Sequence, residues 1–348
     1  MSNAAMTLVR QSIIAVIVAA SVPALATSQR TFVSGQGSDA AACSITLPCR
    51  SFAAAILQTI AGGEVIVLDS AGYGPVTITQ SVTITAPPGV YAGISVPASA
   101  PIGVLINAPA GKIVLRGLTI NSTGGMMGIS FALGDGLTIE RCRISGFSAL
   151  GARGIYQNAG VMTVRDTVIS DGYDGVYLVA GKATLDGLSI ERMEDIGVTA
   201  FGLLTMRAST ISNTYRGIAA FDPAVVSLDA MTISDASNAN VAAFASTPGS
   251  STIIHVLRSQ IVGAFYCILA NASNGGSSRI HVTESVIAKC VNGVYTTGAG
   301  LAIVSHATIA GNGIGLNATN DNVYTLQNNE VFDNTSSSSG LVIPIPYQ

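Results

Sequence analysis

The chain has 348 residues, a formal net charge of -3 and only 10% charged residues, while 49% of its residues are hydrophobic and 38 are glycine. Long solvated helices would need far more glutamate and lysine, so this composition argues against a helical enzyme and favours tightly packed small elements. The sequence has no basic patch and no lysine- and arginine-rich tail, which argues against nucleic acid as a partner.

The first 26 residues have the pattern of an export signal. Arg10 is followed by an apolar run of about 14 residues that starts at Ile13 and ends in an A-x-A cleavage pattern, Ala24 to Ala26. This run is shorter than the ~20 residues that a membrane-spanning helix needs. We therefore expect residues 1–26 to be removed, a mature protein without a membrane span, and a secreted, periplasmic or cell-surface location.

Two of the five cysteines are predicted to form a disulfide. In an exported protein, Cys43 and Cys49 in CSITLPC are suitable partners that would close a short loop. Cys142, Cys267 and Cys290 follow no zinc-type spacing, and we expect them to be buried as small side chains.

Residues 27–62 are predicted to form an N-terminal cap that contains a short helix. Ser51 can cap the start of this helix, and Gly62-Gly63 would end it before a strand over 65–68. An uncovered strand edge invites pairing with other chains, so a helix that covers the edge protects it. The apolar side of the helix would include Phe52, Ile56 and Ile60.

Residues 63–340 contain a repeat of 21 to 28 residues. An aliphatic pair with a spacing of five recurs ten times, and a second apolar site follows most pairs, usually after a glycine. Three strands per repeat, each too short to bury its own face, form a core only by stacking on neighbouring copies. The pairs are Leu115/Ile120, Ile139/Ile144, Val164/Ile169, Leu185/Ile190, Met206/Ile211, Leu228/Ile233, Val256/Ile261, Val282/Ile287, Val304/Ile309 and Leu326/Val331.

This pattern predicts an all-β fold, a right-handed parallel β-helix (solenoid) with a short N-terminal capping helix. A leucine-rich repeat would show a dense leucine and asparagine signature, and a β-propeller would need longer repeats. At about 4.8 Å per stacked strand, ten repeats make a rod of roughly 48 Å. Residues 341–348 are predicted to be a C-terminal tail in which Pro344 and Pro346 cannot donate to a further strand.

The sequence resembles a known family in its N-terminal and repeat motifs. The entry TFVSGQGSDAAACSITLPCRSFAAAI, the strand-rich GGEVIVLDSAGYGPVTITQSVTI and the glycine-punctuated repeats are similar to exported bacterial right-handed parallel β-helix proteins of the pectate-lyase-like superfold. The resemblance covers about Arg30 to Phe332 and implies the fold. That superfold includes lyases, hydrolases, epimerases, tailspikes and adhesins, so the resemblance implies no single activity.

Two outward columns follow from the alternation of side chains along each strand. The first alternates in charge and would favour correct stacking of the repeats, because a shift by one repeat would place like charges together. The second carries mostly hydroxyls and ends in two stacked histidines. These two could jointly bind a metal ion or act as a base, but we interpret them as surface residues because no carboxylate shares their column. The first column is Arg116, Glu140, Arg165, Asp186, Arg207 and Asp229, and the second is Thr138, Thr163, Thr184, Thr205, Ser227, His255 and His281.

The strongest candidate for a functional site is the polar turn that follows the aliphatic pair in four neighbouring repeats. Its acids are Asp171, Asp174, Glu191, Glu194 and Asp195, its arginines are Arg153 and Arg216, and its tyrosines are Tyr156, Tyr173, Tyr177 and Tyr215. Clustered carboxylates can raise one another's pKa or bind Ca²⁺, for which Asp171 and Asp174 are candidates. Tyrosines can stack on sugar rings. Turns are ordinarily polar, however, so Arg-Asp stacking there is a competing interpretation.

The function that we predict is an exported carbohydrate-binding or cell-surface interaction module without catalysis, whose partner is a polysaccharide or cell-surface glycan. The alternative is a polysaccharide lyase or glycoside hydrolase for acidic polysaccharide. Its catalytic candidates would be Asp174, Glu194, Asp195, Arg153 and Arg216. A third alternative is a structural rod or adhesin. We expect a monomer without a cofactor, except that a lyase would call for Ca²⁺.

Overall fold

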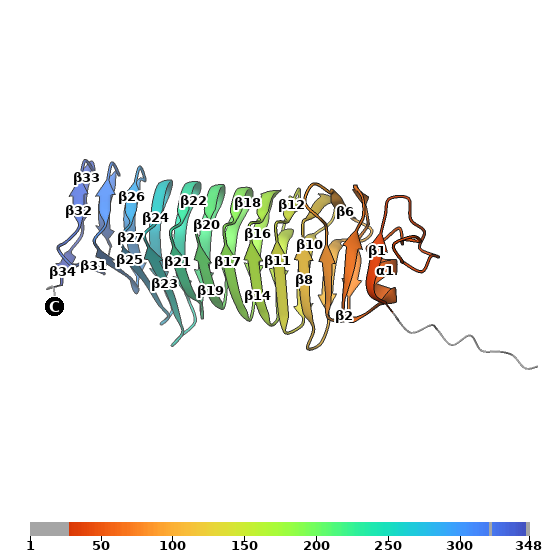
Figure 1. Ribbon diagram of the computed structural model, residues 1–348. Helices are drawn as coiled ribbons and strands as arrows, with labels where there is room; N and C mark the ends of the chain where they lie inside the picture. The colour runs from red at the N-terminus through yellow and green to blue at the C-terminus, as the bar shows by residue number, and fades with distance from the viewer. Residues whose placement is uncertain (1–27, 320–321, 346–348) are drawn as a thin grey trace, which may run out of the picture.

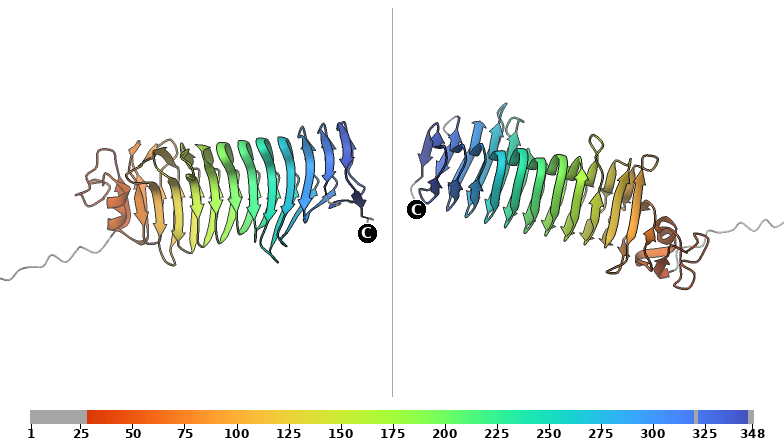
Figure 2. Two further views of the ribbon diagram at one scale, coloured as in Figure 1. Left: turned by 180° about the vertical axis from the view of Figure 1, so that it is seen from behind. Right: turned by 90° about the horizontal axis from the view of Figure 1, so that it is seen from above.

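The computed structural model describes residues 28–319 and 322–345 as one elongated parallel β-helix (Figure 1). The capping helix lies at one end of the rod and the last described strand at the other, and further views show the same stacked coils (Figure 2). The predicted all-β solenoid is therefore confirmed. The predicted export signal over 1–26 and the last three residues of the predicted tail lie outside the described residues.

One long wall of the rod is a 14-stranded parallel sheet, here called sheet A. Its strands are β1 (Ser28–Val33), β2 (Thr59–Val67), β5 (Val82–Thr85), β8 (Lys112–Arg116), β11 (Gly136–Glu140), β14 (Val161–Arg165), β17 (Lys182–Asp186), β19 (Leu203–Arg207), β21 (Val225–Asp229), β23 (Ser251–Leu257), β25 (Ser277–Thr283), β28 (Gly300–Ser305), β31 (Val323–Thr325) and β34 (Val342–Pro344).

The other wall is a 20-stranded sheet, here called sheet B, in which most coils contribute two segments. The two segments merge into single strands of 12 to 14 residues in four consecutive coils, β18 to β24. Its strands are β3 (Ala71–Gly72), β4 (Val76–Ile78), β6 (Ala92–Pro97), β7 (Ile102–Asn107), β9 (Leu118–Thr123), β10 (Met127–Leu133), β12 (Arg143–Ser145), β13 (Arg153–Gln157), β15 (Val168–Gly172), β16 (Asp174–Leu178), β18 (Ser189–Ala200), β20 (Thr210–Phe221), β22 (Thr232–Ala245), β24 (Gln260–Ala272), β26 (Val286–Ala288), β27 (Asn292–Gly298), β29 (Thr308–Ala310), β30 (Ile314–Ala318), β32 (Glu330–Phe332) and β33 (Ser336–Ser339).

The predicted aliphatic columns form the core between the two sheets. Leu185 is fully buried and stands opposite Val164 on one side and Met206 on the other. Ile190 occupies the corresponding buried position in sheet B, where it stands opposite Ile169. The constant spacing of five residues therefore spans the corner from sheet A to sheet B and returns each pair to the core in every coil.

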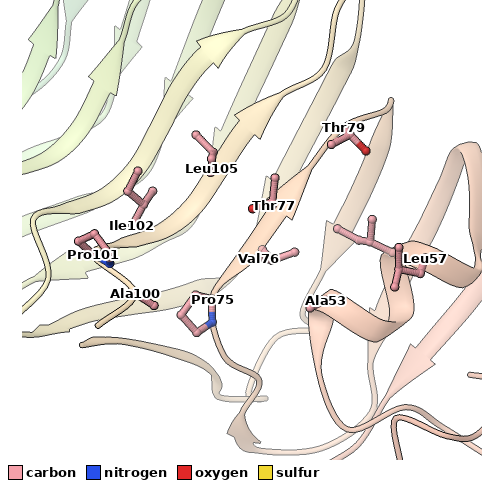
Figure 3. A pocket seen from close by; sticks show the side chains of 11 residues that line it. Ala53, Leu57, Pro75, Val76, Thr77, Thr79, Ala100, Pro101, Ile102 and Leu105 are labelled. Atoms are coloured by element: carbon pink, nitrogen blue, oxygen red, sulfur yellow. The ribbon is translucent and has the colours of Figure 1, made fainter. Parts of the chain in front are cut away.

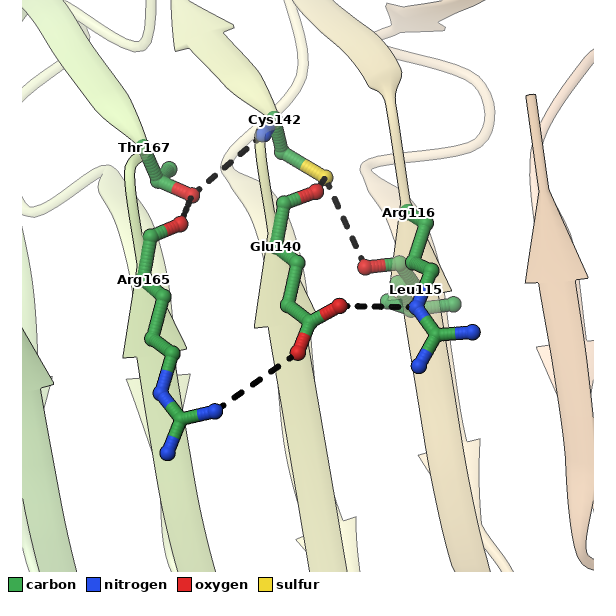
Figure 4. Close-up of polar contacts among 6 residues, drawn as sticks. All are labelled: Leu115, Arg116, Glu140, Cys142, Arg165 and Thr167. Carbon is green, nitrogen blue, oxygen red and sulfur yellow. Dashed lines mark hydrogen bonds and ion pairs between the residues drawn. The ribbon is translucent and has the colours of Figure 1, made fainter. Parts of the chain in front are cut away.

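The outward charge column is confirmed residue by residue in the strand register. Glu140 stands between Arg116 and Arg165, and its carboxylate lies 2.7 Å from the Arg116 Nε and 3.9 Å from the Arg165 guanidinium (Figure 4). Farther along, the Arg207 guanidinium lies 2.7 Å from the Asp186 carboxylate. At the last position of the column, Asp229 forms an ion pair with Arg258, which belongs to the next coil but not to the column.

The capping helix α1 (Phe52–Gln58) begins as predicted, with the Ser51 hydroxyl accepting a hydrogen bond from the Ala54 N–H at 3.2 Å. It ends earlier than predicted, because Thr59 already pairs with Ser28 of β1. The Thr59 hydroxyl also donates to the Ala55 carbonyl at 2.7 Å, which closes the last turn. Ile60, predicted on the apolar side of the helix, is therefore in strand β2.

The cysteines form two disulfides, one of which the sequence predicted. A disulfide joins Cys43 and Cys49, as the spacing suggested. Cys142, Cys267 and Cys290 are buried, as expected. A second disulfide, which the sequence did not predict, joins Cys267 and Cys290 with their Cα atoms 5.8 Å apart. Cys142 is free and buried, and burial raises the pKa of its thiol to about 11.

No helix among residues 28–319 and 322–345 is long and apolar enough to cross a membrane.

Candidate functional site

The predicted polar turn does not form a single cluster. Asp171 and Glu191 both pair with Arg192, whose guanidinium lies 2.6 Å from the Asp171 carboxylate and 2.8 Å from the Glu191 carboxylate. The hydrogen bond from Arg192 lowers the pKa of Asp171. These three side chains are at least partly exposed, so their ion pairs link neighbouring coils but stabilise them only modestly. Arg192 was not among the predicted site residues.

Arg153 and Asp174 form a separate pair on the outer face of sheet B. They stand opposite each other in β13 and β16, with 3.9 Å between the Arg153 Nε and an Asp174 oxygen. Asp174 is only 5% exposed, and its other oxygen accepts a hydrogen bond from the Ile196 N–H at 3.3 Å. Burial raises the pKa of Asp174 to about 6. The Ile196 hydrogen bond and Arg153 oppose the rise, whereas the charge of Asp195 adds to it.

Tyr156 and Tyr177 stack on each other beside this pair, with their ring centroids 6.2 Å apart. The Arg153 guanidinium lies over both rings, 4.0 Å from the Tyr177 centroid and 5.1 Å from the Tyr156 centroid. Phe201 packs on Tyr177 with the centroids 5.9 Å apart. Because other side chains cover these ring faces, the rings offer mainly their edges to a ligand.

The remaining predicted residues lie on or beside this face. Tyr173 packs partly against the core, and burial followed by the charge of Asp195 raises the pKa of its hydroxyl group. Glu194 is exposed and Asp195 half-buried, at an irregularity in the pairing of β18 with β20. Tyr215 is 39% exposed, with the Arg216 guanidinium 4.8 Å from its ring centroid.

An aromatic ladder runs along sheet B through five consecutive coils, with neighbouring ring centroids 5.2 to 6.2 Å apart. Arg216 also lies 5.2 Å from the last ring. That end of the ladder borders a hollow of about 230 Å³ that also carries polar side chains, among them Asn271 and Ser246. The ladder consists of Tyr156, Tyr177, Phe201, Phe221 and Phe244.

The three phenylalanines of this ladder were not among the predicted site residues. Phe201 and Phe221 each follow a glycine of the repeat by four residues, Gly197 and Gly217, and this offset is the signal that could have revealed them. In the next coil the repeat glycine is replaced by an asparagine, so the pattern is interrupted before Phe244. The tyrosines follow their glycines by two residues, which places them one outward position earlier.

The outer face of sheet B also carries an apolar cluster outside the core. Ala239, Ala242 and Leu269 are buried there under the partly buried rings of Phe244, Tyr266 and Tyr295. The centroids of Tyr266 and Tyr295 lie 4.9 Å apart in a stacked arrangement. Apolar side chains gathered on the outside of a sheet often mark a surface that contacts a ligand or partner.

A cavity of about 590 Å³ lies at the capped end of the same face (Figure 3). Its walls are α1 with Ala53 and Leu57, and sheet B with Thr77 and Leu105. Thr77 pairs with Leu105 in the strand register, and the same column of outward-facing positions continues along the rod to Tyr156 and Tyr177. The cavity and the Arg153–Asp174 pair therefore share one face of the rod.

Potential metal ligands are sparse in the described part of the chain. Among residues 28–319 and 322–345, no group of three or more histidine, cysteine, aspartate or glutamate side chains could hold a metal ion. Asp171 and Asp174, the calcium candidates, are therefore not assembled into such a group.

His255 and His281 are neighbours in sheet A, as the column predicted, and burial lowers the pKa of His281.

Asp174 should give the free energy of unfolding a distinctive pH dependence. Its pKa is about 6 in the folded protein against 3.8 ordinarily, so between these values the folded chain holds a proton that the unfolded chain releases. Asp174 therefore leaves the free energy of unfolding unchanged below about pH 3.8 and lowers it increasingly as the pH rises towards 6. We expect Asp174→Asn to exceed the wild type in unfolding free energy by about 1 kcal/mol at pH 7 and to match it near pH 3.5.

Urea denaturation of both proteins at the two pH values measures this difference. Asp171→Asn is the matched control with the opposite sign, because Arg192 lowers the pKa of Asp171 and that variant should lose stability at pH 7. A difference between Asp174→Asn and the wild type that does not change with pH would contradict the raised pKa.

Comparisons with known proteins agree with this fold. The family model described as right handed beta helix region matches residues 102–255. A search of curated proteins found no match to the sequence. The A-module of mannuronan C-5 epimerase AlgE6 from Azotobacter vinelandii is similar in structure, with a TM-score of 0.53 and 13% identity over 82% of this chain and 92% of that chain.

Two further solved structures are more distant. The periplasmic alginate epimerase AlgG has a TM-score of 0.48 and 11% identity over 82% of this chain and 77% of its own. Pectate lyase Pel9A has a TM-score of 0.44 and 14% identity over 91% of this chain and 80% of its own. At such low identity a structural likeness concerns the fold alone. With its stacked parallel strands and the family match, the chain is a right-handed parallel β-helix repeat protein.

Proposed function

We propose that this protein binds an extended acidic polysaccharide along the outer face of sheet B, between β13 and β27, without cleaving it. The observation that carries the proposal is the aromatic ladder flanked by Arg153 and Arg216 on one face of the rod. Guanidinium groups pair well with sugar carboxylates, and the partly exposed edges of the rings add apolar surface that a bound sugar can cover. The fold is shared with a module of a mannuronan epimerase, which is consistent with a glycan ligand.

The burial of the acidic group favours binding over catalysis. A general acid or base must come within about 2.6–3.2 Å of the proton it transfers. Asp174 is 5% exposed, and the Nε of its neighbour Arg153 is buried and without a hydrogen-bond partner. A bound sugar would meet the Arg153 guanidinium and the ring edges before it could reach the Asp174 carboxylate.

Catalysis at Asp174 is the second candidate function, and one observation favours it. A carboxyl group with a pKa of about 6 can both take up and release a proton near neutral pH, as a lyase or hydrolase requires. In this case Asp174 would be the proton-transferring group and Arg153 would bind the sugar carboxylate.

The location belongs to the same proposal. Two disulfides in a chain of this size suit an oxidising compartment, so we place the protein outside the cytosol, secreted, periplasmic or at the cell surface. We further propose that it acts as a monomer.

A binding and turnover assay on a panel of acidic and neutral polysaccharides tests the proposal. We expect saturable binding of acidic chains, and no new unsaturated products or reducing ends with or without Ca²⁺. Arg216→Gln should weaken binding about tenfold through loss of a charged contact. The matched control Arg207→Gln, on the exposed face of sheet A, should leave binding unchanged.

The other outcomes separate the alternatives. Turnover that Asp174→Asn abolishes would replace the binding proposal with an enzyme. The absence of both binding and turnover over the whole panel would overturn both proposals and leave a structural rod or adhesin.

A further inference from the structure

Two of the three histidines in the chain stand side by side on the outer face of sheet A. His255 is in β23 and His281 in β25, directly opposite each other in the parallel register. Their ring centroids lie 4.9 Å apart, with an angle of 55° between the ring planes. The rungs of the solenoid therefore hold two imidazole groups within the reach of a single ion.

The His281 ring has an unused ligand atom. Its Nε2 is buried and has no hydrogen-bond partner in the described structure. A buried imidazole nitrogen without a partner is costly, and an ion or a water molecule that it could bind would remove that cost. Because β23 and β25 are each seven residues long and fully paired with each other, their backbones fix the separation of the two rings.

We propose that His255 and His281 together bind one first-row transition-metal ion. Imidazole nitrogen suits Cu²⁺, Ni²⁺ and Zn²⁺, and the general order of affinities places Cu²⁺ first. The second ring binds at a high effective concentration once the first is attached, so two rings in fixed register gain over one. Water would fill the other coordination positions, since His255 is exposed.

The surroundings both support and limit this site. The Ser227 side chain stands opposite His255 on β21, at the edge of the site. Arg279 lies two residues before His281, and its charge opposes a bound cation. Arg279 is exposed, so water and salt screen that repulsion. The site is on sheet A and does not depend on the polysaccharide face of sheet B.

Titration of the full chain with CuCl₂, and then with ZnCl₂, tests the proposal by calorimetry and by electron paramagnetic resonance of the bound Cu²⁺. We expect a site that depends on both histidines, with nitrogen couplings from two imidazoles and tighter binding of Cu²⁺ than of Zn²⁺. His255→Asn and His281→Asn should each weaken Cu²⁺ binding at least tenfold. His306→Asn, which changes the third histidine, is the matched control and should leave binding unchanged.

Circular dichroism separates loss of the site from loss of the fold. His255 is exposed on the surface, so its substitution should leave the spectrum and the thermal transition unchanged while binding falls. Binding that survives in the double variant His255→Asn/His281→Asn would overturn the proposal. The absence of any Cu²⁺ binding in the wild type, or an equal loss in His306→Asn, would also overturn it.

Discussion

Gly197→Leu is expected to prevent the chain from folding, and Gly197→Ala to lower the free energy of unfolding by about 2–3 kcal/mol. A Cβ atom at residue 197 would lie 2.6 Å from the Gly217 carbonyl oxygen and 2.9 Å from the Cγ2 of Ile211. The oxygen belongs to the backbone of the next coil and cannot move without disturbing the stacking. Larger side chains at this position would therefore force neighbouring coils apart.

Circular dichroism and urea denaturation of the variants measure this effect. Gly136→Ala is the matched control, because a Cβ there would meet nothing closer than the Lys112 Cγ at 3.8 Å. We expect that variant to be within about 0.5 kcal/mol of the wild type, or slightly more stable, since alanine restricts the unfolded chain. Wild-type stability in Gly197→Ala would show that the stacked glycines are not a steric requirement.

The glycine column also explains why the fold could be predicted so fully from the sequence. A solenoid repeats one steric environment in every coil, so a requirement for glycine or for an aliphatic side chain recurs at a nearly constant spacing. The same regularity made the outward columns predictable. Glu140 has to stand between Arg116 and Arg165 once the aliphatic pairs are in register.

Features that break the repeat could not be predicted in this way. Cys267 occupies the place that glycine holds in most coils, and its partner Cys290 belongs to the turn of the next coil. No spacing within one repeat brings these two together. The early end of α1 has a similar cause, because Ser28, distant in sequence, pairs with Thr59.

The sequence located the acids, arginines and tyrosines of the candidate site, but it did not reveal the phenylalanines of the ladder or the ion-pair partners of the acids. Sequence places the acids in one turn, yet the choice of ion-pair partner depends on the direction of each side chain. Arg192 has a backbone φ of 56°, and its guanidinium pairs with Asp171. Asp174 begins the next strand and is buried beside Arg153. Asp171, in an exposed ion pair, and Asp174, a buried carboxyl group with a raised pKa, are therefore separated by a corner of only a few residues.

Leu185→Ala is expected to lower the free energy of unfolding by about 3 kcal/mol, whereas Asp186→Ala, at the next residue, should cost less than about 1 kcal/mol. Leu185 is fully buried between Val164 and Met206, so its truncation leaves a cavity that rigid neighbouring coils cannot fill. Asp186 pairs with Arg207 at 2.7 Å, but the Arg207 side chain is 56% exposed and water screens the pair.

Urea denaturation at low and high ionic strength distinguishes the two contributions. The Leu185→Ala deficit should persist in 1 M NaCl, where the Debye length falls to about 3 Å, while the Asp186→Ala deficit should vanish. An equal cost for both variants would mean that the charge column stabilises the rod as strongly as the core does. The expected contrast would mean that the buried aliphatic columns provide most of the stability. The charge column would mainly disfavour a shift by one coil, because such a shift brings like charges together.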